Sequence, residues 1–136
     1  MCLIIISIFA NMSDKQKLLI ALGTNVNQKQ NIQKAMDLLR KTWHDILFTN
    51  LKWTKPIGMD SDLFYNCLAY TKVDENLSQV QQILKNIEKT CGNTETDRAH
   101  QKIQMDIDIL MFGTHKLHEH DWQRSYIQEL IQEIDY

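Results

Sequence analysis

The chain has 136 residues, of which 43% are hydrophobic and 24% charged, and its formal net charge is −2. This length fits one domain with a single core, and the composition is ordinary for a soluble globular protein. The small negative charge argues against nonspecific nucleic-acid binding, which needs clustered Lys and Arg, but not against binding a nucleotide. Three scattered cysteines, Cys2, Cys67 and Cys91, form no C-x-x-C pair, so they favour reduced thiols in a cytoplasm over zinc or a disulfide framework.

The N-terminal residues differ in composition from the rest of the chain. Residues 2–10 are nearly all apolar, yet this run is too short to span a bilayer and lacks the basic leader of a secretory signal. A second methionine, Met12, precedes a polar stretch and then a clear strand pattern. We therefore expect residues 1–11 to be a disordered or non-native extension and residues 12–136 to form a single domain.

Apolar spacing predicts the secondary structure along the rest of the chain. The expected elements are a strand at 18–22, a helix at 28–43, a β-like segment at 46–54, a loop at 55–63, a strand at 64–73, a helix at 77–91, a flexible loop at 93–103, a strand at 104–113 and a short helix near 127–134. Asn76 and Gln79 form a capping-box pattern at the start of the second long helix, and Gly92 is placed to end it.

This order of elements predicts an α+β fold of the ferredoxin-like βαββαβ type. The expected sandwich has an antiparallel sheet with helices packed on one face, which leaves the other face for a ligand and the loops.

Two acidic residues stand out in the last strand, which we expect to be central in the sheet. Asp106 and Asp108 alternate with the apolar residues Met105, Ile107 and Ile109, so both carboxylates point to the same side. Neighbouring carboxylates repel each other and are costly to desolvate without a counter-charge, which one or two Mg²⁺ ions could supply. The alternative is an edge strand with one wet face, on which the two acids only aid solubility; the motif alone leaves both open.

Several short motifs follow one another in a recognisable order. They are Leu22-Gly23-Thr24-Asn25, Thr54-Lys55-Pro56-Ile57-Gly58, Phe64-Tyr65-Asn66, Ile87-Glu88, the run from Met105 to Gly113, and a tail with His118, Arg124, Tyr126 and Glu133-Ile134. Together they resemble the 6-hydroxymethyl-7,8-dihydropterin pyrophosphokinase family of folate biosynthesis, over residues 17–135. The resemblance implies a single pyrophosphokinase-like domain that transfers pyrophosphate from ATP to a reduced pterin and gives AMP.

The resemblance also implies a metal site and a pterin site. Asp106 and Asp108 would hold two Mg²⁺ ions, which can clamp the attacking and leaving oxygens of an in-line displacement. Asn66 would read the polar edge of the pterin with its amide, and Phe64 and Tyr126 would stack on the two faces of the ring. Residues that would line the same pocket are Thr54 and Ile57.

For the nucleotide, the resemblance implies a set of mostly cationic side chains. His118 and Arg124 would contact the phosphates of ATP, and Arg98 and Lys102 would act from the loop before the aspartates. Glu88 is grouped with the nucleotide site, although a solvated acid that pairs with a loop cation is the simpler interpretation.

One stretch departs from the family pattern. Asn93 stands where an Arg usually follows the glycine, and residues 97–103 replace an Arg-Trp-x-x-Arg-like run. With one inserted residue, Arg98, His100 and Lys102 could take the places of Arg, Trp and Arg. The departure motivates a second hypothesis, in which the chain is a catalytically weakened or inactive homologue that binds pterin or nucleotide in a regulatory role.

Simpler interpretations remain for single residues. Asn66 could be a strand residue bonded to backbone, Tyr126 a core aromatic, and Arg98 and Lys102 surface charges. A third hypothesis is a ferredoxin-like protein-interaction domain with neither ligand, which failure to bind both the pterin and Mg-ATP would favour. We otherwise expect a cytoplasmic monomer that binds ATP and a reduced pterin and has no nucleic-acid or membrane partner.

Overall fold

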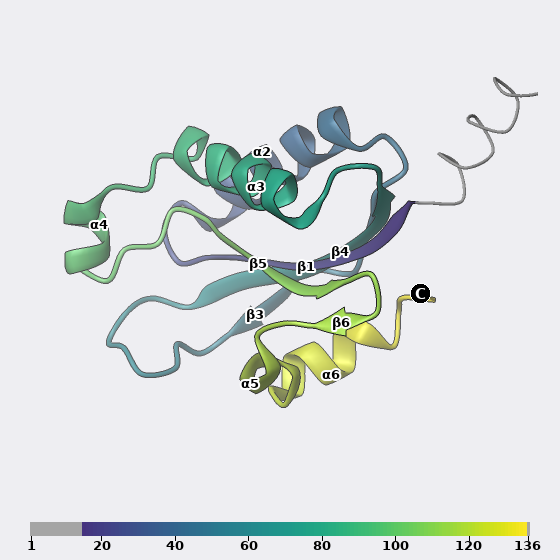
Figure 1. The fold of residues 1–136 in the computed structure, drawn as a ribbon. Helices are drawn as coiled ribbons and strands as arrows, with labels where there is room; N and C mark the ends of the chain where they lie inside the picture. The colour runs from purple at the N-terminus through teal and green to yellow at the C-terminus, as the bar shows by residue number, and fades with distance from the viewer. Residues whose placement is uncertain (1–14, 136) are drawn as a thin grey trace, which may run out of the picture.

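Residues 15–135 are described by a computed structural model, in which an antiparallel six-stranded sheet carries helices on both faces (Figure 1). The elements are β1 (Gln16–Thr24), α2 (Gln28–Thr42), β2 (Leu47–Phe48), β3 (Lys52–Thr54), β4 (Phe64–Val73), α3 (Leu77–Thr90), α4 (Glu95–Ala99), β5 (Asp106–Phe112), β6 (His115–Lys116), α5 (Glu119–Trp122) and α6 (Ser125–Ile131). This arrangement confirms the expected α+β ferredoxin-like class. The predicted extension at residues 1–11 lies outside the described residues.

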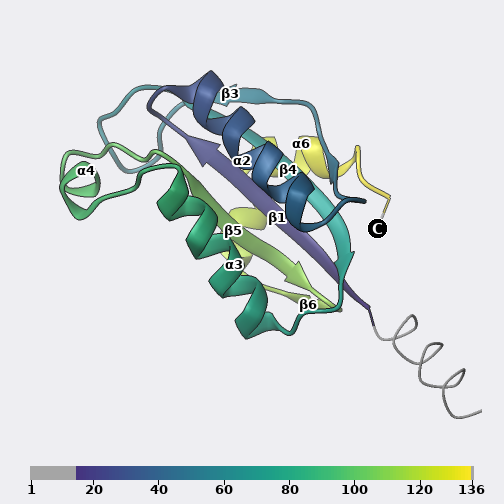
Figure 2. The ribbon, with the colours of Figure 1, turned by 90° about the horizontal axis from the view of Figure 1, so that it is seen from above.

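The central strand is β1, which runs between β4 and β5 (Figure 2). The strand order is β2-β4-β1-β5-β6, and β3 also pairs with β4. The prediction that the aspartate strand is central is therefore wrong, because β5 has the full-length β1 on one side and only the two-residue β6 on the other. In the register of β1 with β5, Ala21 faces Asp108 and Gly23 faces Asp106.

Alternation along the strands divides the apolar side chains between two cores. On one face, α2 and α3 cover a cluster that includes Ile20, Leu39 and Ile107. On the other face, α5 and α6 bring Trp122 and Ile127 onto a smaller cluster. The expectation that helices lie on one face only is therefore wrong, although α5 and α6 cover just part of the second face.

Helix α3 begins and ends as predicted, but the connection from it to β5 contains a helix that was not expected. The predicted capping box is present, since Asn76 Oδ1 accepts from Gln79 N at 2.9 Å and Gln79 Oε1 accepts from Asn76 N at 2.8 Å. Gly92 follows the helix with a φ of 101°, a conformation that favours glycine. Residues 93–103, predicted as a loop, contain the short helix α4, whose N-terminal cap is Thr94.

Along the described chain, no helix is both long and apolar enough to cross a membrane.

Candidate active site

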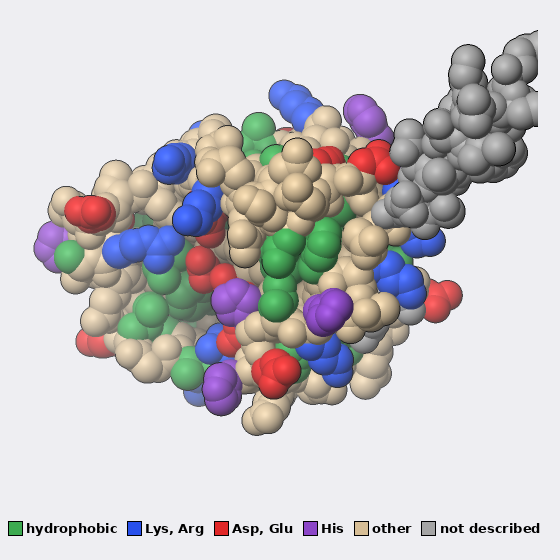
Figure 3. Space-filling model, in the orientation of Figure 1, with side chains coloured by type: hydrophobic (Ala, Val, Ile, Leu, Met, Phe, Trp, Pro, Cys, Tyr) green, Lys and Arg blue, Asp and Glu red, His purple; other side chains and the backbone are tan. Residues whose placement is uncertain are grey.

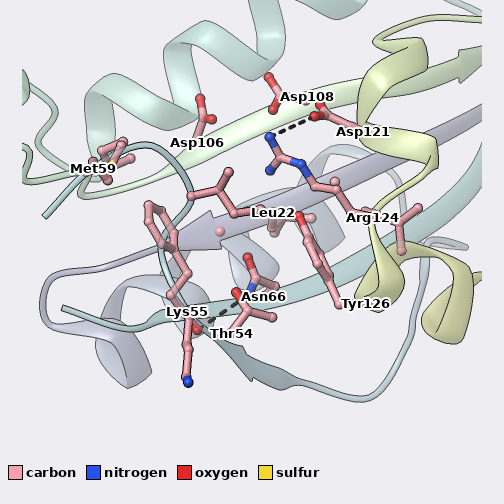
Figure 4. Close-up of a pocket in the computed structure, with 16 residues that line it drawn as sticks. Leu22, Thr54, Lys55, Met59, Asn66, Asp106, Asp108, Asp121, Arg124 and Tyr126 are labelled. Atoms are coloured by element: carbon pink, nitrogen blue, oxygen red, sulfur yellow. Dashed lines mark hydrogen bonds and ion pairs between the residues drawn. The ribbon is translucent and has the colours of Figure 1, made fainter. Parts of the chain in front are cut away.

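A cavity of about 220 Å³ lies over one end of the sheet, between the strands, the loop after β3 and helix α6 (Figure 4). It is lined by Ala21, Leu22, Gly23, Thr54, Lys55, Ile57, Met59, Phe64, Asn66, Ile103, Asp106, Asp108, Asp121, Arg124, Tyr126 and Ile127. The structure thus brings together every residue that the sequence assigned to the pterin pocket. Both aspartates and Arg124 also line this cavity, across from Asn66 and Thr54.

Asn66 is held in one orientation by its own amide nitrogen. Nδ2 donates to Thr54 Oγ1 at 2.8 Å, to the Lys52 carbonyl at 3.2 Å and to the Phe64 carbonyl at 3.4 Å. A buried amide with this many fixed contacts cannot rotate freely, so its carbonyl oxygen has a defined position at the cavity. The simpler interpretation of Asn66 as a residue bonded to backbone therefore holds, and it is compatible with ligand recognition.

Two aromatic side chains reach the cavity from different elements. Phe64 comes from the start of β4, and Tyr126 comes from α6, where it also packs against the second core cluster. Burial raises the pKa of the Tyr126 hydroxyl, and the neighbouring Arg124 guanidinium opposes this effect. Tyr126 is thus both a packing residue, as the simpler interpretation had it, and part of the cavity wall.

Asp106 and Asp108 share one side of β5, as the alternation predicted. The apolar residues that alternate with them, Met105, Ile107 and Ile109, are buried. Burial, followed by the negative charge of Asp106, raises the pKa of Asp108 from 3.8 to about 6. Among residues 15–135, neither aspartate forms an ion pair with a Lys or Arg. The pair is therefore a concentration of negative charge that the described side chains do not neutralise.

The two aspartates also line a second cavity, of about 450 Å³, on the outer side of β5. Its other lining residues are Ser78, Gln81, Gln82, Leu84, Lys85, Glu88, Arg98, Ile107, Ile109, Leu117 and His118. In Figure 3, acidic side chains lie in a hollow of the surface, with Lys, Arg and His side chains around its rim. This polar groove is long enough to follow several turns of α3, from Ser78 to Glu88.

The cationic residues expected at the nucleotide are divided between the cavities. His118 and Arg98 line the second cavity, whereas Arg124 lines the first. Asp121 connects them, because its carboxylate is 3.2 Å from Arg124 Nη2 and 3.9 Å from His118 Nδ1. The sequence reasoning missed Asp121, although the spacing of three residues from each partner was a usable signal.

Lys102 lines neither cavity. It is exposed, and its backbone N–H donates to the carbonyl of Asp97 in α4. Arg98 is therefore the member of the predicted Arg98 and Lys102 pair that the structure places at the groove.

Glu88 is not the solvated acid of the simpler interpretation. Its Oε2 accepts a hydrogen bond from the backbone N–H of Ile107 at 2.8 Å, directly between the two aspartates. Burial raises the pKa of Glu88 from 4.5 to about 7; the hydrogen bond from Ile107 opposes the shift, and the charge of Asp106 adds to it.

The geometry agrees with what comparison with known proteins finds. A family model for 7,8-dihydro-6-hydroxymethylpterin-pyrophosphokinase matches residues 19–136. The chain belongs to this family. A relative from Arabidopsis thaliana, a folate synthesis bifunctional protein, is 28% identical over 127 residues, which cover 82% of this chain and 25% of that protein. The resemblance inferred from the sequence is thereby confirmed, and the chain spans about a quarter of the length of this relative.

A member of the pyrophosphokinase family needs a place for a divalent cation, and the donor set here fits Mg²⁺. Among the described residues, no group of three or more His, Cys, Asp or Glu side chains could hold a metal by itself. Mg²⁺ does not require such a group, because it commonly takes one or two carboxylates and completes its shell with water and phosphate oxygens. Asp106 and Asp108, which line both cavities, meet that requirement.

Proposed function

We propose that the chain transfers the pyrophosphoryl group of ATP to the hydroxymethyl group of 6-hydroxymethyl-7,8-dihydropterin, giving AMP. The observation that supports this best is that two cavities of different character meet at Asp106 and Asp108. One cavity is small and partly aromatic, and the other is a longer polar groove with cations at its rim. An acceptor in the first and a nucleotide in the second would have their reacting groups at the same pair of carboxylates.

In this proposal the first cavity holds the pterin. Phe64 and Tyr126 contact the faces of the ring, and the fixed amide of Asn66 hydrogen-bonds its polar edge. Thr54 and Ile57 close the same wall. A flat heteroaromatic ring with donors and acceptors along one edge suits this combination of aromatic surface and oriented amide.

The second cavity would hold the nucleotide along α3, with the phosphates near Arg98, His118 and the aspartates. Asp106 and Asp108 would hold two Mg²⁺ ions, which when bound neutralise phosphate charge. Asp121 keeps Arg124 and His118 in place on the side of the aspartates that faces α5. Glu88 belongs to this cavity through its contact with the aspartate strand.

Positioning is the main task of the protein in such a transfer. The hydroxymethyl oxygen forms a bond to the β-phosphorus of ATP, the bond from that phosphorus to the oxygen of the departing AMP breaks, and the hydroxyl proton is released. Residues around the two cavities hold the attacking oxygen and the phosphorus in line and exclude water from the pterin side.

The test is an assay of AMP release from ATP and 6-hydroxymethyl-7,8-dihydropterin. Asp106→Asn and Asp108→Asn should each lower turnover by about 10² or more. Each removes a carboxylate that would hold Mg²⁺, and with it the charge stabilisation that the metal would give to the reacting phosphates. Both should fold, because each substitution relieves repulsion and keeps the shape of the side chain. The matched control is Asp74→Asn in the exposed turn before α3, which should retain wild-type turnover. Wild-type turnover in either site variant would contradict the proposal.

The second candidate, an inactive homologue that binds pterin or nucleotide, is favoured by one observation. Lys102 lines neither cavity, so the loop between α3 and β5 brings a single cation, Arg98, to the groove. Binding of the pterin measured by calorimetry, without AMP release in the same preparation, would favour this candidate. The number of Mg²⁺ ions, the monomeric state, the cytoplasmic location and the single domain over residues 12–136 stay predictions.

A further inference from the structure

The half of β5 that carries the aspartates has an outer edge that no strand within residues 15–135 covers. β1 pairs with one side of β5 along its length, but on the other side β6 pairs only with Met111 and Phe112. The backbone groups around Asp106 and Asp108 on this side therefore lack a neighbouring strand. Backbone N–H and C=O groups inside a protein need hydrogen-bond partners, so their partners must come from elsewhere.

Side chains from the end of α3 and from the loop directly after it supply partners for Met105 and Ile107. Asn93 contacts both backbone groups of Met105, which directly precedes β5: its Oδ1 accepts from Met105 N at 3.1 Å, and its Nδ2 donates to the Met105 carbonyl. Two residues on, Glu88 accepts from Ile107 N at 2.8 Å. Residues i and i+2 of a strand present their backbone groups to the same side, so both contacts lie on one edge.

Met105 and Ile107 are the residues on either side of Asp106, and Asp108 follows Ile107. We propose that Asn93 and Glu88 are positioning residues, which together stand in for a missing strand and fix the direction of the two aspartates toward a divalent cation. This inference rests on the proposed function, because it concerns how well the aspartates hold the metal. It also gives Asn93 a role at the position where the family usually has Arg.

The attachment is rigid on the side of the helix as well. Gly92 donates to the Lys89 carbonyl at 2.9 Å, and Asn93 N donates to the Glu88 carbonyl, so Asn93 is bonded back to the last turn of α3. Met105, the residue it holds, is fully buried. Groups behind metal ligands that are fixed in this way commonly alter metal affinity when they are replaced, by roughly 10- to 100-fold.

The variant that tests the inference is Asn93→Ala in the full chain. Mg²⁺ binding is titrated by calorimetry in the presence of a non-hydrolysable ATP analogue, and hydrogen exchange of the Met105 and Ile107 amides is measured on the same protein. We expect Mg²⁺ affinity to fall by about tenfold or more, the Met105 amide to exchange faster, and pterin affinity to stay within about twofold.

The matched control is Asn76→Ala at the other end of the same helix. It also removes an Asn side chain that bonds to backbone, and so costs stability, but it should leave Mg²⁺ affinity and the Met105 amide unchanged. For Glu88, Glu88→Gln keeps an acceptor for Ile107 N and should retain more Mg²⁺ affinity than Glu88→Leu. Should Asn93→Ala fail to fold, Asn93→Asp takes its place, since it keeps the acceptor for Met105 N and loses the donor to the Met105 carbonyl. Its Mg²⁺ affinity should fall, but by less than the fall expected for Asn93→Ala.

Two outcomes separate this inference from the proposed function. Equal Mg²⁺ affinity in the wild type and in Asn93→Ala, with wild-type binding that depends on Asp106, would overturn the positioning role alone. If the wild-type chain with the nucleotide analogue bound no Mg²⁺ at all, the proposed function would fall as well.

Discussion

Gly23 sets how closely β1 can approach Asn66. A Cβ added at Gly23 would lie 2.7 Å from Asn66 Oδ1 and 3.6 Å from Phe64 Cδ1, and the first distance is shorter than a side chain tolerates. Asn66 cannot easily yield, since its Nδ2 is bonded to three groups of β3 and β4. The need for glycine here comes from the close approach of a side chain and not from a positive φ.

Gly23→Ala should therefore weaken pterin binding. Displacing the Asn66 amide would weaken its proposed hydrogen bonds to the pterin, which are worth about 1 kcal/mol each. We therefore expect the Kd of the reduced pterin to rise roughly tenfold. Calorimetric titration with the pterin measures this, and titration of the same variant with the nucleotide is the control, which should be unchanged. Unchanged pterin affinity would mean that the Asn66 carbonyl does not take part in recognition.

The single-residue predictions succeeded where side-chain direction was decided locally. Asp106 and Asp108 alternate with three apolar neighbours, so their common side followed from the period of a strand. Asn93 and Glu88 could not be placed in this way, because each bonds the backbone of a residue 12 or 19 positions later. Such contacts depend on how α3 packs against β5, which spacing along the chain does not give.

Helix α5 is anchored to the sheet by one side chain. Trp122 is buried, and its Nε1 donates to the Leu110 carbonyl at 3.0 Å and to the Leu117 carbonyl at 3.1 Å. The same short helix carries Asp121, which contacts Arg124 and His118 at the candidate site. The attachment of Trp122 thus also fixes the element that contacts these two side chains.

Trp122→Phe should lower the free energy of unfolding by about 2 kcal/mol, because it removes the hydrogen bonds that Nε1 donates to the Leu110 and Leu117 carbonyls and reduces buried surface. Urea unfolding measures the change. The control is Trp53→Phe: Trp53 is 42% exposed and stacks on Tyr65 with ring centroids 4.2 Å apart, so we expect a loss below about 1 kcal/mol. Equal losses in the two variants would show that the hydrogen bonds of Trp122 contribute little.

Among the elements, strong periodicity and capping were reliable guides. The apolar spacing of α3 and its capping box predicted its start correctly. α4 was missed because none of its residues is buried, so no apolar period marks it. Ile127 and Leu130 did indicate the last helix, but a helical period does not tell which face of the sheet the helix will cover.

For the molecule as a whole, two half-buried acids make stability depend on pH. The pKa of Asp108 rises from 3.8 to about 6 and that of Glu88 from 4.5 to about 7, in both cases chiefly through burial. Between about pH 4 and 7 the folded state therefore binds more protons at these groups than the unfolded state does. Their contribution to the free energy of unfolding must then fall as the pH rises through this range.

We expect the urea midpoint of the metal-free protein to fall less between pH 5 and pH 8 in the double variant Asp108→Asn, Glu88→Gln than in the wild type. Comparison of the two proteins removes the contribution of all other titrating groups. Added Mg²⁺ with a nucleotide analogue should reduce the wild-type slope as well, because it stabilises the ionised aspartate. Parallel pH profiles for wild type and double variant would contradict the assignment.

The uncovered edge of β5 also bears on solubility. An open row of backbone donors and acceptors invites a strand of another molecule to add to it, which is a common start of aggregation. Asn93 and Glu88 occupy part of that row with side chains, so the contacts that orient the aspartates also block intermolecular strand addition. Weakening them would therefore promote self-association along with the loss of metal affinity.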